Sequence, residues 1–281
     1  MPTFAAPDGT ELAYHLVGEG EPLLCLPGGP MRASTYLGDL GGLARHRRLV
    51  VLDLRGTGNS AVPVDTATYR CDRQVGDVEA LREHLGLDLV DVLAHSAGGD
   101  LALLHAVRHP RRIRTLTLIT PRARALGVDF TEEHRRDAAA LRSAEPWFEA
   151  AHAAYERIWA GGVADADWDA IAPFFYGCWD RAAQAHAAAD VEQSNEEAAE
   201  LYASPGAFDP AGALAVVAAL EARVLVLAGA LDSGPLPRVA ADVAGLFPRA
   251  ELAVQAGAGH FPWLDDPQRF TETVSTFLTQ Q

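Results

Sequence analysis

A short turn between an apolar run and a helical pattern constrains the fold of this chain more than any other segment. Residues 89–94 read as a buried strand, the residues after Gly98 follow a helical pattern, and Ser96 lies in the turn between them. Only small residues fit where the two backbones nearly touch, and Ala94 and Gly98 occupy those positions. So tight a turn holds Ser96 in strained backbone geometry, with its hydroxyl projecting from the carboxyl end of the strand. Ser96 is therefore a candidate nucleophile, although the same short pattern also occurs by chance.

A serine nucleophile needs two partners. Its hydroxyl is weakly nucleophilic at neutral pH, so a histidine must act as base and a carboxylate must fix the tautomer of that histidine. On this kind of turn the chain order is Ser, then Asp or Glu, then His. Asp232 directly follows a later buried-strand pattern, and His260 lies in a glycine-rich loop after a further short strand. We predict a triad of Ser96, Asp232 and His260, with Asp129 as the alternative acid.

The remaining histidines fit this role less well. His95 lies in the turn itself, and we expect its side chain to point away from the site. The others fall on helical patterns or at surface and edge positions: His15, His46, His84, His105, His109, His134, His152 and His186.

Acyl-transfer chemistry also needs hydrogen-bond donors for a developing oxyanion, each contributing about 3 to 4 kcal/mol when it is preorganised. The N–H of Ala97 is the first predicted donor. The second is the N–H of Gly29, because the apolar run at 22–26 ends in Pro27-Gly28-Gly29-Pro30. A glycine pair before proline is also what an ordinary tight turn looks like.

These segments together resemble the α/β-hydrolase fold, and most closely its proline iminopeptidase branch. The resemblance spans the chain apart from its middle. Its Asp-x-Arg-Gly-x-Gly-x-Ser pattern is matched at every specified position of residues 53–60. The other matching segments are residues 27–30, the turn around Ser96, Asp232 and Gly259-His260.

The chain departs from the peptidase pattern around the predicted acyl pocket. The family segment His-Gly-Gly-Pro-Gly appears as residues 27–31, which keep both glycines but lack the leading His and the last Gly. Ala94 replaces the usual first glycine of the serine turn. Ala97 replaces the tryptophan that these peptidases often carry after the serine.

Buried-strand patterns alternate with helical ones along most of the chain. This alternation predicts an α/β fold with a mostly parallel, doubly wound sheet that helices cover on both faces. Among the elements expected are a short helix over 34–43 and a strand over 113–120. The strand signal disappears after Pro121, so we predict a core from residues 1–120 and 213–281 and a helical lid, or cap, from residues 121–212.

The predicted lid contains more large aromatic rings than a small helical cap would expose. We expect most of them in its own core and two or three in the pocket wall, with Phe175 and Trp179 as the candidates. Glu192, Glu196 and Glu200 are spaced four apart in a helix expected over 191–202, so they would share one face. That face is either solvated or, as the resemblance implies, supplies a carboxylate such as Glu192 or Glu196 to a substrate ammonium group.

Composition excludes several classes of partner. The chain has 38 acidic and 23 basic residues, a net charge of −15, so a phosphate backbone would be repelled and nucleic acid is not an expected partner. Every basic residue is arginine, which removes lysine-based covalent chemistry and a P-loop lysine. No metal-ligand or dinucleotide-binding spacing is present, so neither a metal nor a cofactor is expected.

Cysteine usage and hydropathy indicate the compartment. Cys25, Cys71 and Cys178 are odd in number and widely spaced, which suits a reducing environment better than a disulfide framework. The sequence has no apolar run of the roughly 20 residues that a membrane span needs and no leader pattern at its start. We therefore expect a cytoplasmic protein without membrane contact.

Three functions fit these observations. The first, which the resemblance implies, is a serine hydrolase that cleaves the N-terminal amide bond of a small peptide. The second is an esterase, lactonase or thioesterase that acts on a small apolar metabolite. The third is a ligand-binding protein of the same fold without turnover, which would not need all three of Ser96, Asp232 and His260.

Overall fold

The computed structural model describes residues 1–162 and 164–280. Within these residues an eight-stranded sheet runs through the molecule in the order β1-β2-β4-β3-β5-β6-β7-β8. β1 and β2 are antiparallel to their neighbours, and the strands from β4 to β8 are parallel. The strands are β1 Thr3–Ala5, β2 Glu11–Val17, β3 Pro22–Leu26, β4 Arg48–Leu52, β5 Val90–His95, β6 Ile113–Ile119, β7 Arg223–Gly229 and β8 Ala250–Gln255. The predicted mostly parallel α/β architecture is confirmed.

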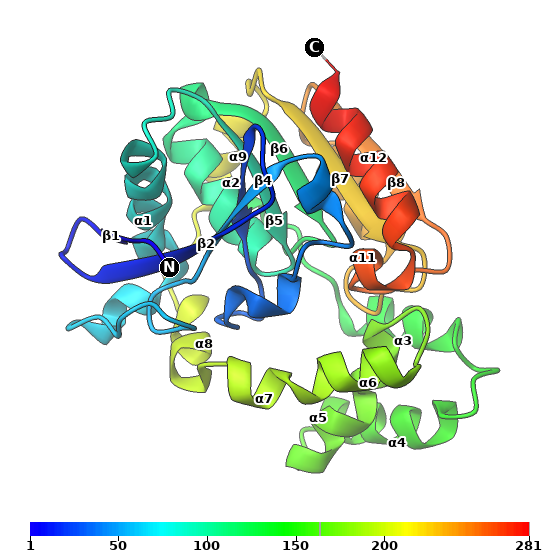
Figure 1. Cartoon of the computed structure of the whole chain (residues 1–281). Coiled ribbons are helices and arrows are strands. Elements are labelled where there is room, and N and C mark those ends of the chain that lie inside the picture. The colour runs from blue at the N-terminus through cyan, green and yellow to red at the C-terminus, as the bar shows by residue number, and fades with distance from the viewer. Residues whose placement is uncertain (163, 281) are drawn as a thin grey trace.

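Helices cover both faces of the sheet (Figure 1). One face carries α1 Cys71–His84, α2 Gly98–Arg108, α9 Pro210–Val217 and α10 Pro237–Ala244. The other face carries α11 Pro262–Asp265 and α12 Pro267–Thr279. None of the described helices combines the length and the apolar character that a membrane crossing would need.

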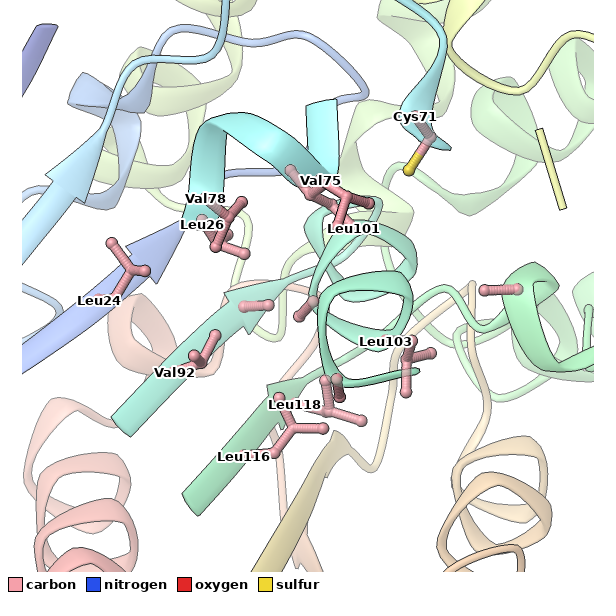
Figure 2. Close-up of a cluster of buried hydrophobic side chains, with 14 of the residues drawn as sticks. Leu24, Leu26, Cys71, Val75, Val78, Val92, Leu101, Leu103, Leu116 and Leu118 are labelled. Atoms are coloured by element: carbon pink, nitrogen blue, oxygen red, sulfur yellow. The ribbon is translucent and has the colours of Figure 1, made fainter. Parts of the chain in front are cut away.

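Alternation along the strands divides the core into two layers. In β3, Leu24 and Leu26 pack toward α1 and α2, whereas Leu23 and Cys25 pack toward α12. Figure 2 shows the first layer, where side chains of β3, β5 and β6 meet those of α1 and α2. Because successive strand residues point to opposite faces, a strand buried on both faces reads as an unbroken apolar run.

A helical insertion lies between β6 and β7, and the predicted limit of the lid at residue 212 falls inside α9. Figure 1 shows its helices gathered along one end of the sheet. They are α3 Glu132–Ala140, α4 Phe148–Trp159, α5 Asp165–Ile171, α6 Arg181–Ala188, α7 Asp190–Gln193 and α8 Glu196–Tyr202. α3, α4 and α5 pack around a small core of their own, which includes Tyr155 and Phe174. α8 instead joins the main core through Ala198 and Tyr202.

Two expected helices are wrong in detail. The helix expected over 34–43 is replaced by two 3₁₀ turns, Ser34–Leu37 and Leu43–Arg45, because Gly41 and Gly42 between them adopt left-handed φ values of 64° and 93°. The helix expected over 191–202 is interrupted between α7 and α8. Asn195 there starts a new helix, its side chain accepting a hydrogen bond from the N–H of Ala198.

The sheet topology places Ser96 where two chain connections diverge. β4 pairs with one edge of β3 and β5 with the other. The connections that leave the carboxyl ends of β3 and β5 therefore diverge, and such switch points are where parallel sheets bind ligands. The loop after β3 contains Gly28 and Gly29, and the turn after β5 contains Ser96.

Candidate active site

Ser96 lies in the strained turn that the sequence predicts. Its φ is +51°, in the left-handed region that non-glycine residues seldom adopt. The close approach of backbones is also present, because a Cβ atom on Gly98 would lie 2.5 Å from the carbonyl oxygen of Pro27. The turn thus presents the Ser96 side chain at the carboxyl end of β5 while α2 begins two residues later.

Asp232 and His260 lie together, although 28 positions separate them. The Nδ1 of His260 is 2.9 Å from Oδ2 and 3.1 Å from Oδ1 of Asp232. Asp232 is fully buried, and its Oδ1 also accepts a hydrogen bond from the N–H of Gly234. A carboxylate can only accept here, so Nδ1 carries the proton and Nε2 is left as an acceptor. This is the tautomer that a base for a serine hydroxyl requires.

Ser96 and His260 are both largely enclosed, with 6% and 8% of their surfaces exposed. Within the described ranges, the Ser96 hydroxyl makes no hydrogen bond. Bonds between a nucleophile and its base are often long or poorly aligned until substrate binds.

Asp129, the alternative acid, lies elsewhere. Its Oδ1 accepts a hydrogen bond of 2.7 Å from Nη1 of Arg122, and the carboxylate is about half exposed. Arg122 also lies over the ring of Phe130, with its guanidinium carbon 4.0 Å from the centroid. The structure therefore pairs Asp129 with an arginine and leaves His260 to Asp232.

The loop after β3 passes directly against the nucleophile. A Cβ atom on Gly28 would lie 2.8 Å from Cβ of Ser96 and 3.2 Å from the N of Ala97. The N–H of Gly28 donates to the hydroxyl of Tyr36 at 2.7 Å. In the described part of the chain, the N–H groups of Gly29 and Ala97 have no hydrogen-bond acceptor. Ala97 directly follows Ser96, and Gly29 directly follows the glycine that packs against Ser96, so both stay predicted oxyanion donors.

The helical insertion contacts His260 through a strap, which we define as residues 175–178. The carbonyl oxygen of Phe175 accepts the N–H of His260 at 2.7 Å, and the two rings are 5.8 Å apart. Trp179 packs against Tyr176 at a ring distance of 5.3 Å. Of the two predicted pocket aromatics, Phe175 lies beside His260, whereas Trp179 packs against Tyr176 of the strap.

Asp265 joins this strap to the loop that carries His260. Its carboxylate accepts hydrogen bonds from the N–H groups of Gly259 at 2.8 Å, Gly177 at 2.9 Å and Cys178 at 3.2 Å. Burial raises the pKa of Asp265, and these N–H donors oppose that rise. The sequence did not reveal this role, because the contacts run to backbone groups 6 to 88 positions away.

Of the three glutamates expected on one helical face, only Glu196 and Glu200 share one, because they lie four apart in α8. Glu192 belongs to α7 and Glu196 to α8, and both side chains are exposed. Neighbouring backbone groups contact the loop after β3 instead. The N–H of Ala33 donates to the carbonyl of Gln193 at 2.8 Å, and that of Asn195 donates to the carbonyl of Met31 at 3.0 Å.

The expectation that His95 points away from the site is wrong. Its Nε2 lies 2.9 Å from the carbonyl oxygen of His260, and the two imidazole rings are 4.8 Å apart. The hydroxyl of Thr120 donates to the same carbonyl at 2.9 Å. Neither contact has a signal in the sequence, since each spans 140 positions or more.

The motif at residues 53–60 is structural in this protein. The buried carboxylate of Asp53 accepts hydrogen bonds from the N–H and hydroxyl of Ser34 and from the N–H of Asn59. Although burial alone would raise the pKa of Asp53, these donors lower it. Arg55 forms a buried ion pair with Asp77 of α1, with Nε 2.8 Å from Oδ2. The motif thus fixes the loops beside the site and does not reach it.

Comparison with known proteins agrees with this geometry. A proline iminopeptidase from Heyndrickxia coagulans is 35% identical over 104 residues, which is 37% of this chain and 36% of that protein. The match therefore spans just over one third of that relative's length. A proline iminopeptidase from Lactobacillus delbrueckii subsp. lactis is 28% identical over 95% of this chain and 94% of its own. The solved structure of a thermophilic esterase from Thermogutta terrifontis superposes with a TM-score of 0.70 at 25% identity, covering 98% of this chain and 96% of the esterase.

The family model described as alpha/beta hydrolase fold matches residues 21–267. This match includes the turn around Ser96, the strand before Asp232 and the loop that carries His260. The chain belongs to the alpha/beta hydrolase fold family.

Proposed function

We propose that this serine hydrolase cleaves the N-terminal amide bond of small peptides through an acyl-enzyme intermediate on Ser96. The observation that carries the proposal is the contact between Nδ1 of His260 and the buried carboxylate of Asp232. It leaves Nε2 free to accept a proton, which is the state a general base must have.

In the first half of the reaction, Nε2 of His260 takes the proton from Ser96 while Oγ attacks the substrate carbonyl. The N–H groups of Ala97 and Gly29 donate to the oxyanion that forms. Nε2 then delivers its proton to the leaving amine as the carbon–nitrogen bond breaks. Asp232 stays ionised and stabilises the imidazolium between these two transfers.

In the second half, water replaces the amine. His260 takes one proton from the water as its oxygen attacks the acyl carbon, and the oxyanion is held by the same two N–H groups. Collapse of this intermediate breaks the bond to Oγ, and the proton on Nε2 returns to Ser96. The carboxylic acid product then leaves, and the enzyme is restored.

The two relatives named as proline iminopeptidases support an amide substrate with a free amine. Resemblance to that group also implies a carboxylate that binds the substrate ammonium, for which we proposed Glu192 or Glu196. Both are exposed on the helical insertion, within three positions of residues that contact the loop after β3. Trp179, which packs against Tyr176 of the strap, stays a proposed pocket residue.

An ester is the second candidate substrate. The exposure of Glu192 and Glu196 favours it, since a solvated carboxylate gives little selectivity for an ammonium group. The aromatic ring of Phe175 beside His260 suits an apolar acyl group as well as a prolyl group. Similarity to the Thermogutta terrifontis esterase agrees with this alternative.

A cytoplasmic location and the absence of a nucleic-acid or membrane partner also stay predictions.

A turnover panel tests the two substrates. Prolyl and alanyl p-nitroanilides are compared with their N-acetyl forms and with short-chain p-nitrophenyl esters, with Ser96→Ala as the background control. We expect the free-amine amides to be at least about tenfold faster than the acetylated ones, because a charge-assisted hydrogen bond contributes about 1.5 to 3 kcal/mol. Glu192→Gln or Glu196→Gln should remove that preference. Brisk ester cleavage without amide turnover would establish the second candidate instead.

A fluorophosphonate probe tests the class of chemistry separately from the substrate. Ser96 should be labelled, and Ser96→Ala should not be. A wild-type protein that resists the probe and turns over no substrate in the panel would be a ligand-binding member of the fold.

A further inference from the structure

A buried chain of hydrogen bonds connects the loop after β3 to the loop that carries His260. The N–H of Gly28 donates to the hydroxyl of Tyr36, which lies 2.7 Å from Nδ1 of His95. On the other side of the imidazole, Nε2 lies 2.9 Å from the carbonyl oxygen of His260. We call this chain the relay. It joins three segments that are distant in the sequence.

The direction of each bond in the relay is fixed by its ends. A carbonyl oxygen only accepts, so Nε2 of His95 must carry a proton and donate it to His260. Burial lowers the pKa of His95 well below its usual range, and the positive guanidinium of Arg32 also lowers it. A neutral imidazole with its proton on Nε2 can only accept at Nδ1, so the hydroxyl of Tyr36 donates there. The same hydroxyl oxygen accepts the N–H of Gly28.

The relay has little freedom to rearrange. Tyr36 is 5% exposed and His95 is 2% exposed. The ring of His95 lies between His260, Phe261 and Trp263, with centroid distances of 4.8, 5.2 and 4.8 Å. A buried, fully paired chain of this kind is rigid, and removal of any member leaves a buried donor or acceptor unpaired.

We propose that His95 and Tyr36 are positioning residues that set the spacing between the oxyanion donor on Gly29 and the base on His260. The loop after β3 is located through Gly28, and the main chain of His260 is located through its carbonyl oxygen. Both segments are therefore held in place by one imidazole, which belongs to the residue directly before Ser96. The proposal rests on the proposed function, because it assigns these two residues a role in acyl transfer.

Two substitutions of His95 separate the arms of the relay. Asn places an amide oxygen near the position of Nδ1, so His95→Asn keeps an acceptor for Tyr36 and loses the donor to His260. Gln reaches further, so His95→Gln keeps a donor toward His260 and loses the acceptor for Tyr36. Tyr36→Phe removes a single oxygen and disconnects Gly28.

We measure kcat and KM with the substrate that wild type turns over fastest in the panel. The concentration of active enzyme is determined by titrating Ser96 with the fluorophosphonate probe. We expect kcat to fall about 10- to 100-fold in His95→Asn and less in His95→Gln, because loss of a buried hydrogen bond raises the activation barrier enough to slow the reaction by a factor of this size. KM should stay within about threefold of the wild-type value. Tyr36→Phe should lower kcat about tenfold on the same grounds.

The chain supplies matched controls. Tyr14 is as buried as Tyr36, and its hydroxyl also contacts a histidine, His84 at 3.2 Å, away from the site. His105 on α2 is fully buried and contacts Glu79 at 3.1 Å. Tyr14→Phe and His105→Asn should lose stability while kcat per folded molecule stays at the wild-type value.

A double-variant cycle shows whether the two residues act through one chain. Tyr36→Phe combined with His95→Gln should be no slower than the slower single variant, because both interrupt the same connection. If the fold-decreases in kcat of the two single variants multiply in the double variant, the two residues act independently and the relay is refuted.

Different results would refute the positioning role of the relay and the proposed function. If wild type shows no probe labelling and no turnover, the proposed function is refuted. If wild type turns over substrate while His95→Asn and Tyr36→Phe keep kcat within twofold, the relay has no part in positioning. Should His95→Asn not fold, Tyr36→Phe alone decides the question, because it removes one atom.

Discussion

Adding one methyl group at Gly28 should inactivate the enzyme without unfolding it. The new Cβ atom of Gly28→Ala would lie 2.7 Å from the carbonyl oxygen of His95 and 2.8 Å from Cβ of Ser96. Carbon atoms in ordinary contact are about 3.5 to 4.0 Å apart. The loop after β3 must therefore move away from Ser96 by about 0.7 Å or more.

This displacement separates the Gly29 donor from the nucleophile it serves. A misplacement of about 1 Å in catalytic geometry costs about 10²-fold in rate. Loss of one oxyanion donor costs about 10² to 10³-fold in kcat. We therefore expect kcat of Gly28→Ala to fall by about 10² to 10³-fold, with the melting temperature lowered by only a few degrees.

Ester or amide turnover normalised to folded protein checks this expectation, with Gly245→Ala as the control. A Cβ atom on Gly245 meets nothing closer than 3.4 Å, and its φ is −62°. The same glycine-to-alanine change there should leave turnover at the wild-type level. Activity within threefold of wild type in a folded Gly28→Ala protein would refute the assignment of this loop to the oxyanion site.

Three further outcomes follow from the same contacts. Asp232→Asn should lower kcat by about 10³ to 10⁴-fold with the fold intact, whereas Asp129→Asn should leave it unchanged; the reverse pattern would move the acid to Asp129. Asp265→Ala removes the acceptor of three N–H groups, of which that of Gly259 belongs to a buried residue. The variant should lose about 1 to 3 kcal/mol of stability in urea and some of its kcat, and an unfolding midpoint equal to that of wild type would contradict this. Burial lowers the pKa of His105 from 6.5 to about 4. As the pH falls, His105 is therefore protonated in the unfolded chain before it is protonated in the folded protein, and the free energy of unfolding declines between about pH 6.5 and pH 4. His105→Gln should flatten that decline in urea titrations at pH 7, 5.5 and 4.

The elements that local patterns define were predictable. β5, the turn at Ser96 and α2 depend on an apolar run, two small residues and a helical pattern that are adjacent in the sequence. Asp232 and His260 could be found for a related reason, because Asp232 lies just after the apolar strand β7 and His260 lies in the glycine-rich loop after β8. The carboxyl ends of parallel strands meet at one edge of a sheet, so strand order alone brings these residues together.

Contacts between distant loops were not predictable. The helix expected over 191–202 satisfies helical spacing, but Asn195 caps a second helix and turns the chain toward Met31. The role of His95 depends on a carbonyl oxygen 165 positions away. Among the described residues, the donors to Asp265 are all backbone N–H groups. A backbone donor has no residue type that a sequence could reveal.

The strap at residues 175–178 couples the position of the helical insertion to the position of the base. If the whole insertion lifted as a rigid body, the Phe175 carbonyl would leave the N–H of His260, and Asp265 would lose its two strap partners. The open molecule would then have no correctly placed base. α3, α4 and α5 are bound to the strap as well, because Phe175 packs against their small core and Arg142 donates to the carbonyl oxygens of Tyr176 and Gly177. Detachment of the strap would therefore make the open enzyme catalytically silent.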